Sequence, residues 1–137
     1  MSQAAVELVL RGYRAFVAGD FDTVAEMLDP DVQWTAIEPT LPSGHEDVMA
    51  ILAERRADGH RVEIERCVGV GDRVAVSFRV AGVERDVSDD RPLQTRRYFT
   101  VGRYSAIVTV RAERVVRVQE YPHFSAALEA LGLEPEE

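Results

Sequence analysis

The chain of 137 residues contains no lysine, so all 16 of its basic residues are arginines. Without a lysine amine the protein cannot form a Schiff base, use lysine as a general base or build the lysine of a phosphate-binding loop. Cysteine is almost as scarce. Cys67 stands alone, which excludes a disulfide within the chain, and we interpret it as a small hydrophobe on a strand.

No apolar run approaches the roughly 20 residues that cross a bilayer, so no membrane partner is expected. The N-terminus begins directly with a helical pattern and lacks a basic signal segment, which favours a cytoplasmic location. The formal net charge is −8, with acidic residues concentrated at 87–90 and 134–137. This charge repels phosphate backbones, so no nucleic acid partner is expected either.

Motifs for metals and cofactors are also missing. The three histidines, His45, His60 and His123, lie far apart in sequence, and there is neither an H-x-x-x-H motif nor a cysteine pair. No glycine-rich dinucleotide loop follows a strand, and no serine or cysteine nucleophile motif is present. The sequence therefore predicts a protein that uses neither a metal nor a cofactor.

Hydrophobic periodicity predicts helices in the first half and strands in the second, which is typical of an α+β fold. The predicted helices cover residues 3–18, the segment between Asp20 and Pro30, the segment between Ser43 and Gly59, and residues 123–132. The predicted strands cover residues 31–37, 61–70, 72–83, 94–110 and 114–121. At the last hairpin, Ala112-Glu113 lacks the glycine that a two-residue turn favours, so a longer loop is expected.

A single domain over residues 1–137 follows, ending in an acidic tail at 134–137 that we expect to be disordered. One curved antiparallel sheet wrapped around three helices of the N-terminal half, with a short C-terminal helix, encloses a cone. The interior of such a cone is lined by alternate strand residues and by one stripe of the first helix. A pocket for a small molecule is therefore expected there.

The segment YRAFVAGDFDTVAEMLDPDVQW, residues 13–34, resembles the opening of the NTF2-like, SnoaL-like polyketide cyclase superfamily. The S-G-H-E-D start of the third helix, the V-G-D-R-V-A-V hairpin and the closing V-x-E-Y-x-x-F continue the resemblance over residues 3–133. It implies an NTF2-like cone. The superfamily holds isomerases, cyclases, dehydratases, epoxide hydrolases and non-catalytic binding or assembly domains, so the resemblance leaves the function open.

The residues that act in two branches of this superfamily are replaced here. Ketosteroid isomerases of this fold use a tyrosine of the first helix as oxyanion donor, and that position is Gly12, next to Tyr13. Their general-base aspartate corresponds to Thr35, so steroid-type isomerisation is not expected. In polyketide cyclases the last strand ends on Tyr-x-Asp, with the aspartate as acid/base. His123 takes that place here, two residues after Tyr121.

His123 is the first catalytic candidate, because an unperturbed histidine titrates near ~6.5 and can move protons at neutral pH. Tyr121 would share its face, hydrogen-bonding the imidazole or donating to a developing oxyanion. The alternative is that His123 only caps the final helix. Glu38 is the third catalytic candidate, because a carboxylate beside Trp34 against apolar walls would have a raised pKa. Its alternative is a solvated loop residue.

Five further residues are expected to line the pocket and bind substrate. Arg66 shares strand parity with Val62 and Ile64, which predicts an inward guanidinium. The substrate-binding candidates are Trp34, Tyr13, Arg66, Phe16 and Phe78. For Trp34 and Tyr13 the alternative is a purely structural place in the core.

These residues predict a pocket protein for a small apolar carbonyl or hydroxyl compound. The favoured function is a cofactor-free acid/base enzyme of the isomerase, cyclase or dehydratase type, with His123 as proton shuttle. The alternative is a non-catalytic ligand-binding or dimerisation module of the same fold. In either case a homodimer through the outer sheet face is expected.

Overall fold

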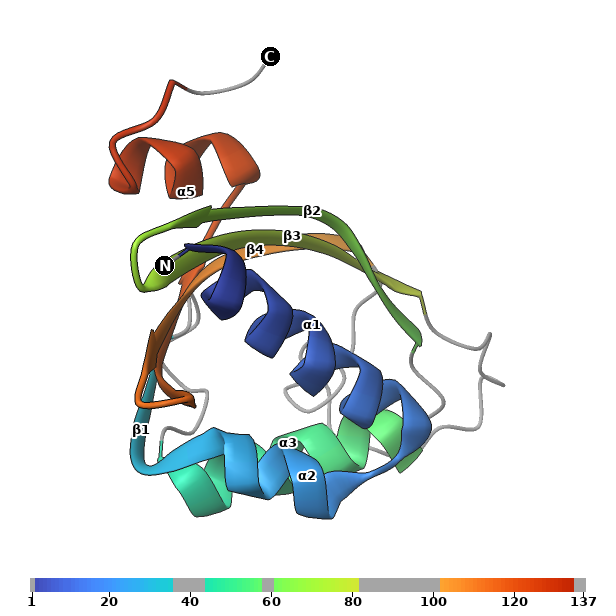
Figure 1. Ribbon diagram of the computed structural model, residues 1–137. Helices are drawn as coiled ribbons and strands as arrows, with labels where there is room; N and C mark the ends of the chain where they lie inside the picture. The colour runs from blue at the N-terminus through green and yellow to red at the C-terminus, as the bar shows by residue number, and fades with distance from the viewer. Residues whose placement is uncertain (1, 36–43, 58–60, 82–101, 135–137) are drawn as a thin grey trace.

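The computed structural model of the protein describes residues 2–35, 44–57, 61–81 and 102–134. It confirms the α+β fold class (Figure 1). The elements, in chain order, are α1 (Ser2–Ala18), α2 (Phe21–Met27), β1 (Leu28–Thr35), α3 (His45–Ala57), β2 (Arg61–Val70), β3 (Arg73–Ala81), β4 (Gly102–Arg111), β5 (Arg114–Tyr121) and α5 (Phe124–Ala130). Among the described helices, none combines the length and the hydropathy of a membrane span.

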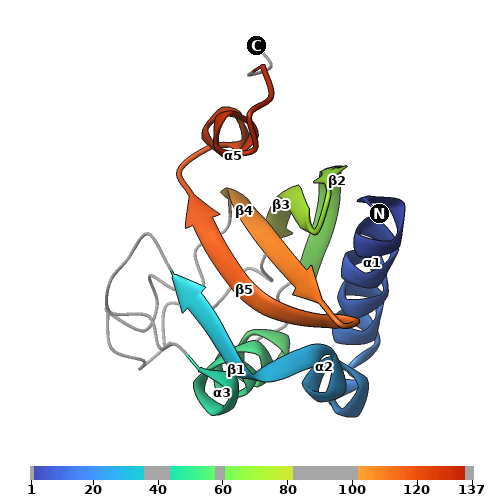
Figure 2. The same cartoon turned by 60° about the vertical axis from the view of Figure 1, so that its left-hand side comes forward.

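The five strands form one sheet in the order β1-β5-β4-β3-β2. Strands β2 to β5 pair with one another in antiparallel fashion, as expected, whereas β1 pairs with β5 in parallel (Figure 2). Strand β1 also begins earlier than predicted, at Leu28, because α2 ends at Met27 and does not extend to Pro30. Pro30 lies within β1, which is an edge strand, where a missing backbone N–H is tolerated.

The caps at the ends of the first two helices follow the sequence pattern. Gly19, with φ of 77°, ends α1, and Asp20 caps α2 by accepting a hydrogen bond from the Thr23 backbone N–H at 3.2 Å. The Thr23 hydroxyl also donates to the Asp20 carboxylate at 2.7 Å. These two bonds, led by the one from the hydroxyl, lower the pKa of Asp20.

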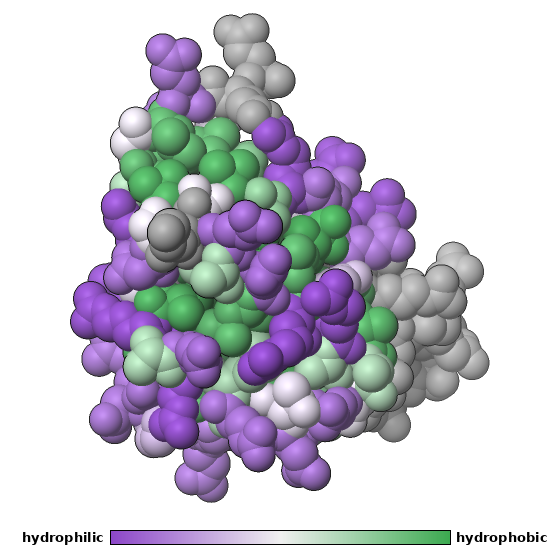
Figure 3. All heavy atoms as spheres, in the orientation of Figure 1, coloured by the Kyte–Doolittle hydropathy of each residue, from purple (hydrophilic) through white to green (hydrophobic). Residues whose placement is uncertain are grey.

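The sheet curves around α1, so that it has a concave and a convex face. In Figure 1, α1 lies under the concave face, α2 and α3 close the end of the cone, and α5 lies on the convex face. A cluster that includes Ala75, Ile107 and Leu128 buries the contact between α5 and the sheet. Apolar side chains gather at α5, while most of the surface in the view of Figure 3 is hydrophilic.

A bulge in β2 reverses which side chains face the concave side. The pairing of β2 with β3 shifts between Ile64 and Arg66. Ile64 and Cys67 both pack with an inner cluster, on the concave side, that includes Val76. Val68 packs instead with the outer cluster, which is the one beneath α5. Arg66 lies on the outer side, with its guanidinium carbon 5.2 Å from the centroid of the Phe124 ring. The predicted inward orientation of Arg66 is wrong, because one extra residue inverts strand parity.

The turn between β4 and β5 also differs from the prediction. Only Ala112 and Glu113 separate Arg111 from Arg114, and their φ angles are 50° and 62°. Positive φ at both positions is the two-residue turn whose twist matches that of the strands. The expected longer loop is wrong, because the strand pairing imposes the tight turn on residues that disfavour it.

Replacing Ala112-Glu113 with Asn-Gly should stabilise the protein by about 1–2 kcal/mol, since a left-handed conformation costs a residue with a Cβ about that much. Chemical denaturation of the double variant measures this. Gly71, with φ of 62°, provides the opposite control, because Gly71→Ala should destabilise. A double variant no more stable than the parent would show that the turn stores no strain.

Candidate ligand-binding site

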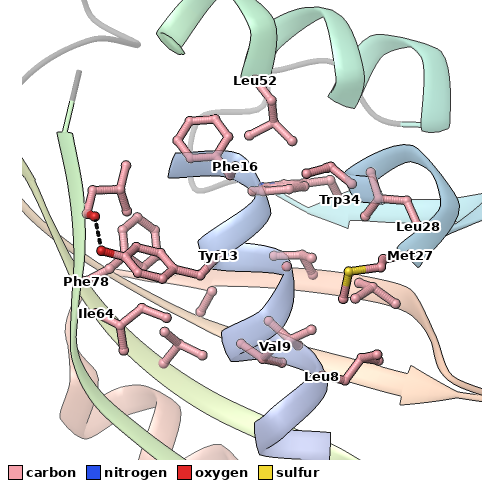
Figure 4. Close-up of a pocket in the computed structure, with 18 residues that line it drawn as sticks. Leu8, Val9, Tyr13, Phe16, Met27, Leu28, Trp34, Leu52, Ile64 and Phe78 are labelled. Atoms are coloured by element: carbon pink, nitrogen blue, oxygen red, sulfur yellow. Dashed lines mark hydrogen bonds between the residues drawn. The ribbon is translucent and has the colours of Figure 1, made fainter. Parts of the chain in front are cut away.

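A cavity of about 200 Å³ lies between α1 and the concave face of the sheet. Eighteen of the described residues line it, and Figure 4 shows their side chains converging from α1, α2, α3 and the strands of the sheet. Four of the five predicted substrate-binding residues are among them. These four are Trp34, Tyr13, Phe16 and Phe78. Of the eighteen, only Tyr13 and Trp34 carry a nitrogen or oxygen in the side chain, so the cavity is strongly apolar.

The helical spacing of α1 directs one stripe of residues into this cavity. Leu8, Gly12 and Phe16, each one turn apart, line it together with Val9 and Tyr13. Val17, one residue after Phe16, lies off this stripe and is 45% exposed.

Tyr13 ties α1 to the edge of the sheet. Its hydroxyl donates a hydrogen bond to the backbone carbonyl of Val62 in β2 (Figure 4). Because β2 is an edge strand, part of its backbone has no partner within the sheet. The bond satisfies a half-buried phenol and positions its ring in the cavity wall.

A carboxylate that the sequence analysis missed lies beside the cavity. Glu120 is paired across the sheet with Ala106, which lines the cavity, and follows Val118 by two residues on the same face. The Trp34 indole N–H donates to its Oε2 at 3.3 Å. Glu120 is half-buried and stands where the concave face of β5 ends. The parity of Glu120 with Val118 could have revealed it.

His123 and Tyr121 do not face this cavity. Tyr121 packs with the outer cluster beneath α5, next to Leu128. His123 is exposed and is the N-cap of α5, where its Nδ1 accepts a hydrogen bond from the Ala126 backbone N–H at 3.2 Å. The alternative interpretation of His123 as a helix cap matches this geometry. The expected place of His123 beside the substrate is wrong, because Tyr121 and His123 follow the convex parity of β5.

Among the described residues, His45 and Cys67 do not line the cavity. Glu38 lies outside the described residues. His45, at the start of α3, places its Nε2 3.0 Å from the carbonyl oxygen of Ala25 in α2. Burial raises the pKa of the Cys67 thiol, in keeping with a small hydrophobe. Within the described ranges, no group of three or more His, Cys, Asp or Glu side chains could hold a metal ion.

The model of one protein family, the SnoaL-like domain, matches residues 9–118. The chain belongs to the SnoaL-like domain family. This confirms the resemblance that the sequence motifs indicate. The sequence has no match among the curated proteins.

Solved structures place this SnoaL-like protein among NTF2-like folds. A M. tuberculosis LEH-like epoxide hydrolase has a TM-score of 0.67 at 19% identity, covering 88% of this chain and 83% of the other. An NTF2-like protein from Cytophaga hutchinsonii has a TM-score of 0.65 at 11% identity, covering 85% and 88%. A de novo designed protein with a curved β-sheet has a TM-score of 0.63 at 20% identity, covering 96% and 98%.

These likenesses show the fold alone. Ketosteroid isomerase-like and polyketide cyclase-like proteins are also among the structural neighbours. A fold shared by hydrolases, isomerases and a designed chain does not fix an activity, so the function of this protein has to be argued from its own cavity.

Replacing His123 with alanine should destabilise the protein by about 1 kcal/mol, the usual cost of losing a helix N-cap. His123→Asp should retain the stability, because a carboxylate also accepts from the free N–H groups of the first turn. Chemical denaturation compares the two variants. Equal loss of stability in both would contradict the capping role.

Proposed function

We propose that this SnoaL-like protein binds a small, largely apolar carbonyl or hydroxyl compound in the cavity, and that Glu120 moves a proton on it. The reaction would be a cofactor-free isomerisation, cyclisation or dehydration. The observation that supports this most is the Trp34–Glu120 hydrogen bond at 3.3 Å, which holds a carboxylate beside an apolar cavity.

The size of the cavity limits the ligand. An apolar cavity of about 150 Å³ in another protein stays dry and binds benzene. At about 200 Å³, this cavity suits a single ring with a short substituent. Burial of apolar ligand surface would supply the binding free energy, at about 25 cal/mol for each Å².

The carboxylate of Glu120 offers the chemistry that such a ligand needs. A carboxylate can take a proton from the carbon next to a carbonyl and return it at a second carbon, which is an isomerisation. If the ligand carries a hydroxyl on the neighbouring carbon, loss of water completes a dehydration instead. Trp34 fixes one oxygen of the carboxylate, which orients the group toward the cavity wall. To serve an enolate oxygen, the Tyr13 hydroxyl would exchange its hydrogen bond to the Val62 carbonyl for one to the ligand.

The catalytic candidates from the sequence take different roles in this proposal. His123 and Tyr121 are not given a catalytic role, because their side chains lie on the convex face. Glu38 follows Trp34 by four residues in the sequence and stays a candidate for a second acid/base carboxylate.

Binding without chemistry is the second candidate function. It is favoured by the state of the two polar side chains in the wall, since Tyr13 already donates to Val62 and Trp34 to Glu120. Among the described lining residues there is no pair of titratable side chains. A cavity of this kind can serve as a simple receptor for an apolar molecule.

We also propose a cytoplasmic location and a homodimer, which would use the convex face that α5 leaves uncovered. Ile107 is buried under α5, whereas Arg79 and Arg103 are exposed on the neighbouring part of the sheet. An interface there would be polar, as in many non-obligate assemblies, and would lack the apolar character of a protein core.

One experiment separates the candidates. The protein is incubated in D₂O with a one-ring ketone, phenylacetone, and NMR follows deuterium uptake at the carbons beside the carbonyl. Fluorescence of Trp34, the single tryptophan, reports binding. Glu120→Gln should slow the exchange by about 100-fold or more, the usual contribution of a general base, while phenylacetone still binds. His123→Asp, which keeps the cap of α5, is the matched control and should leave the rate unchanged.

Binding with an exchange rate no faster than in buffer would favour the non-catalytic receptor. Fluorescence that stays constant through the titration, with no exchange, would contradict the proposed ligand class.

A further inference from the structure

Gly12 lies in the middle of α1, where glycine destabilises a helix relative to alanine. Its backbone does not require glycine, because the positive-φ glycines of the described chain are Gly19, Gly44, Gly71 and Gly132. The reason for a glycine at this position must therefore be sought in the space around it.

Met27 occupies that space. A Cβ added to Gly12 would lie 3.2 Å from the terminal methyl carbon of Met27 and 3.6 Å from its sulfur. The first distance is shorter than the separation of an optimal carbon–carbon contact, which is roughly 3.5–4.0 Å. Both residues line the cavity, and Met27 is only 4% exposed. In Figure 4 the side chain of Met27, which ends α2, lies beside α1 among the other lining side chains.

We infer that Gly12 and Met27 together set the largest ligand that the cavity accepts. Methionine has three rotatable side-chain bonds and fills irregular space more adaptably than leucine. With glycine at position 12, the Met27 methyl rests against the backbone of α1 and leaves the cavity open. A methyl group at position 12 would push the Met27 methyl away from α1, and because both residues line the cavity, less space would remain for a ligand.

The inference rests on the proposed binding function for its consequence, but the contact itself can be tested without a ligand. The protein is labelled with ¹³C at the methionine methyl groups, of which there are three. In Gly12→Ala the Met27 methyl resonance should shift and gain contacts with the rings of Phe16 or Trp34. An unchanged Met27 resonance would overturn the inference. Thermal unfolding should show Gly12→Ala at least as stable as the parent, because alanine favours the helix.

A graded series of alkylbenzenes, from toluene to butylbenzene, tests the consequence through Trp34 fluorescence. Gly12→Ala should leave the affinity for toluene unchanged and lower the affinity for the longest alkylbenzenes by about fourfold for each excluded methylene. Met27→Ala should have the opposite effect and allow longer alkylbenzenes to bind. In the double variant the alanine at position 12 should have no further effect, since the side chain that it displaces is gone.

Val17→Ala, at an exposed position of the same helix, is the matched control and should bind each alkylbenzene with the affinity of the parent protein. Equal weakening of all ligands by Gly12→Ala, or the same weakening in the Met27→Ala background, would overturn the inference. If the parent protein binds no alkylbenzene, the proposed ligand class fails, and the methyl resonance alone decides whether Gly12 and Met27 shape the cavity.

Discussion

From Arg117 to Tyr121, consecutive side chains of β5 point to opposite faces of a sheet whose two faces have different environments. On the concave side, Val118 lines the cavity under α1, and Glu120, which shares its face, lies beside the cavity. On the convex side, Tyr121 packs beneath α5. This alternation decides which titratable group can meet a ligand. A carboxylate is brought to the cavity, and the histidine that follows the strand is directed to the other side of the sheet, where it caps α5.

The convex face is consequently a structural layer. α5 buries Ala75 and Ile107 of the sheet, and the guanidinium of Arg66 lies over the Phe124 ring at its first turn. With both faces covered near the middle of the sheet, β3 and β4 can hold their curvature while the concave side remains partly empty. The cavity depends on this arrangement, because its wall consists of strand residues whose backbones are fixed from the outside.

Much of the fold could be predicted from the sequence, because its signals are local. The spacing of apolar residues predicts α1, Asp20 predicts the start of α2, and Gly71-Asp72 predicts the turn between β2 and β3. Parallel pairing of β1 with β5 could not be predicted, since it depends on contacts between segments about 85 residues apart, which strand periodicity does not encode.

The candidate site could be predicted only in part, for physical reasons that differ between residues. The aromatic residues Trp34 and Phe78 follow regular patterns and do line the cavity. Arg66 was misplaced because a bulge is invisible in an alternating sequence. The chemistry of His123 makes it a catalytic candidate, but the parity of β5 directs it to the convex face and places Glu120 on the concave one. A titratable side chain is informative only once the face it occupies is known.

A crystal of the protein pressurised with xenon tests most directly whether the apolar space beneath α1 is open to a ligand, because xenon enters dry apolar cavities. We predict a xenon atom among the side chains of Phe16, Trp34 and Phe78. A filled cavity with no xenon at this position would contradict the account.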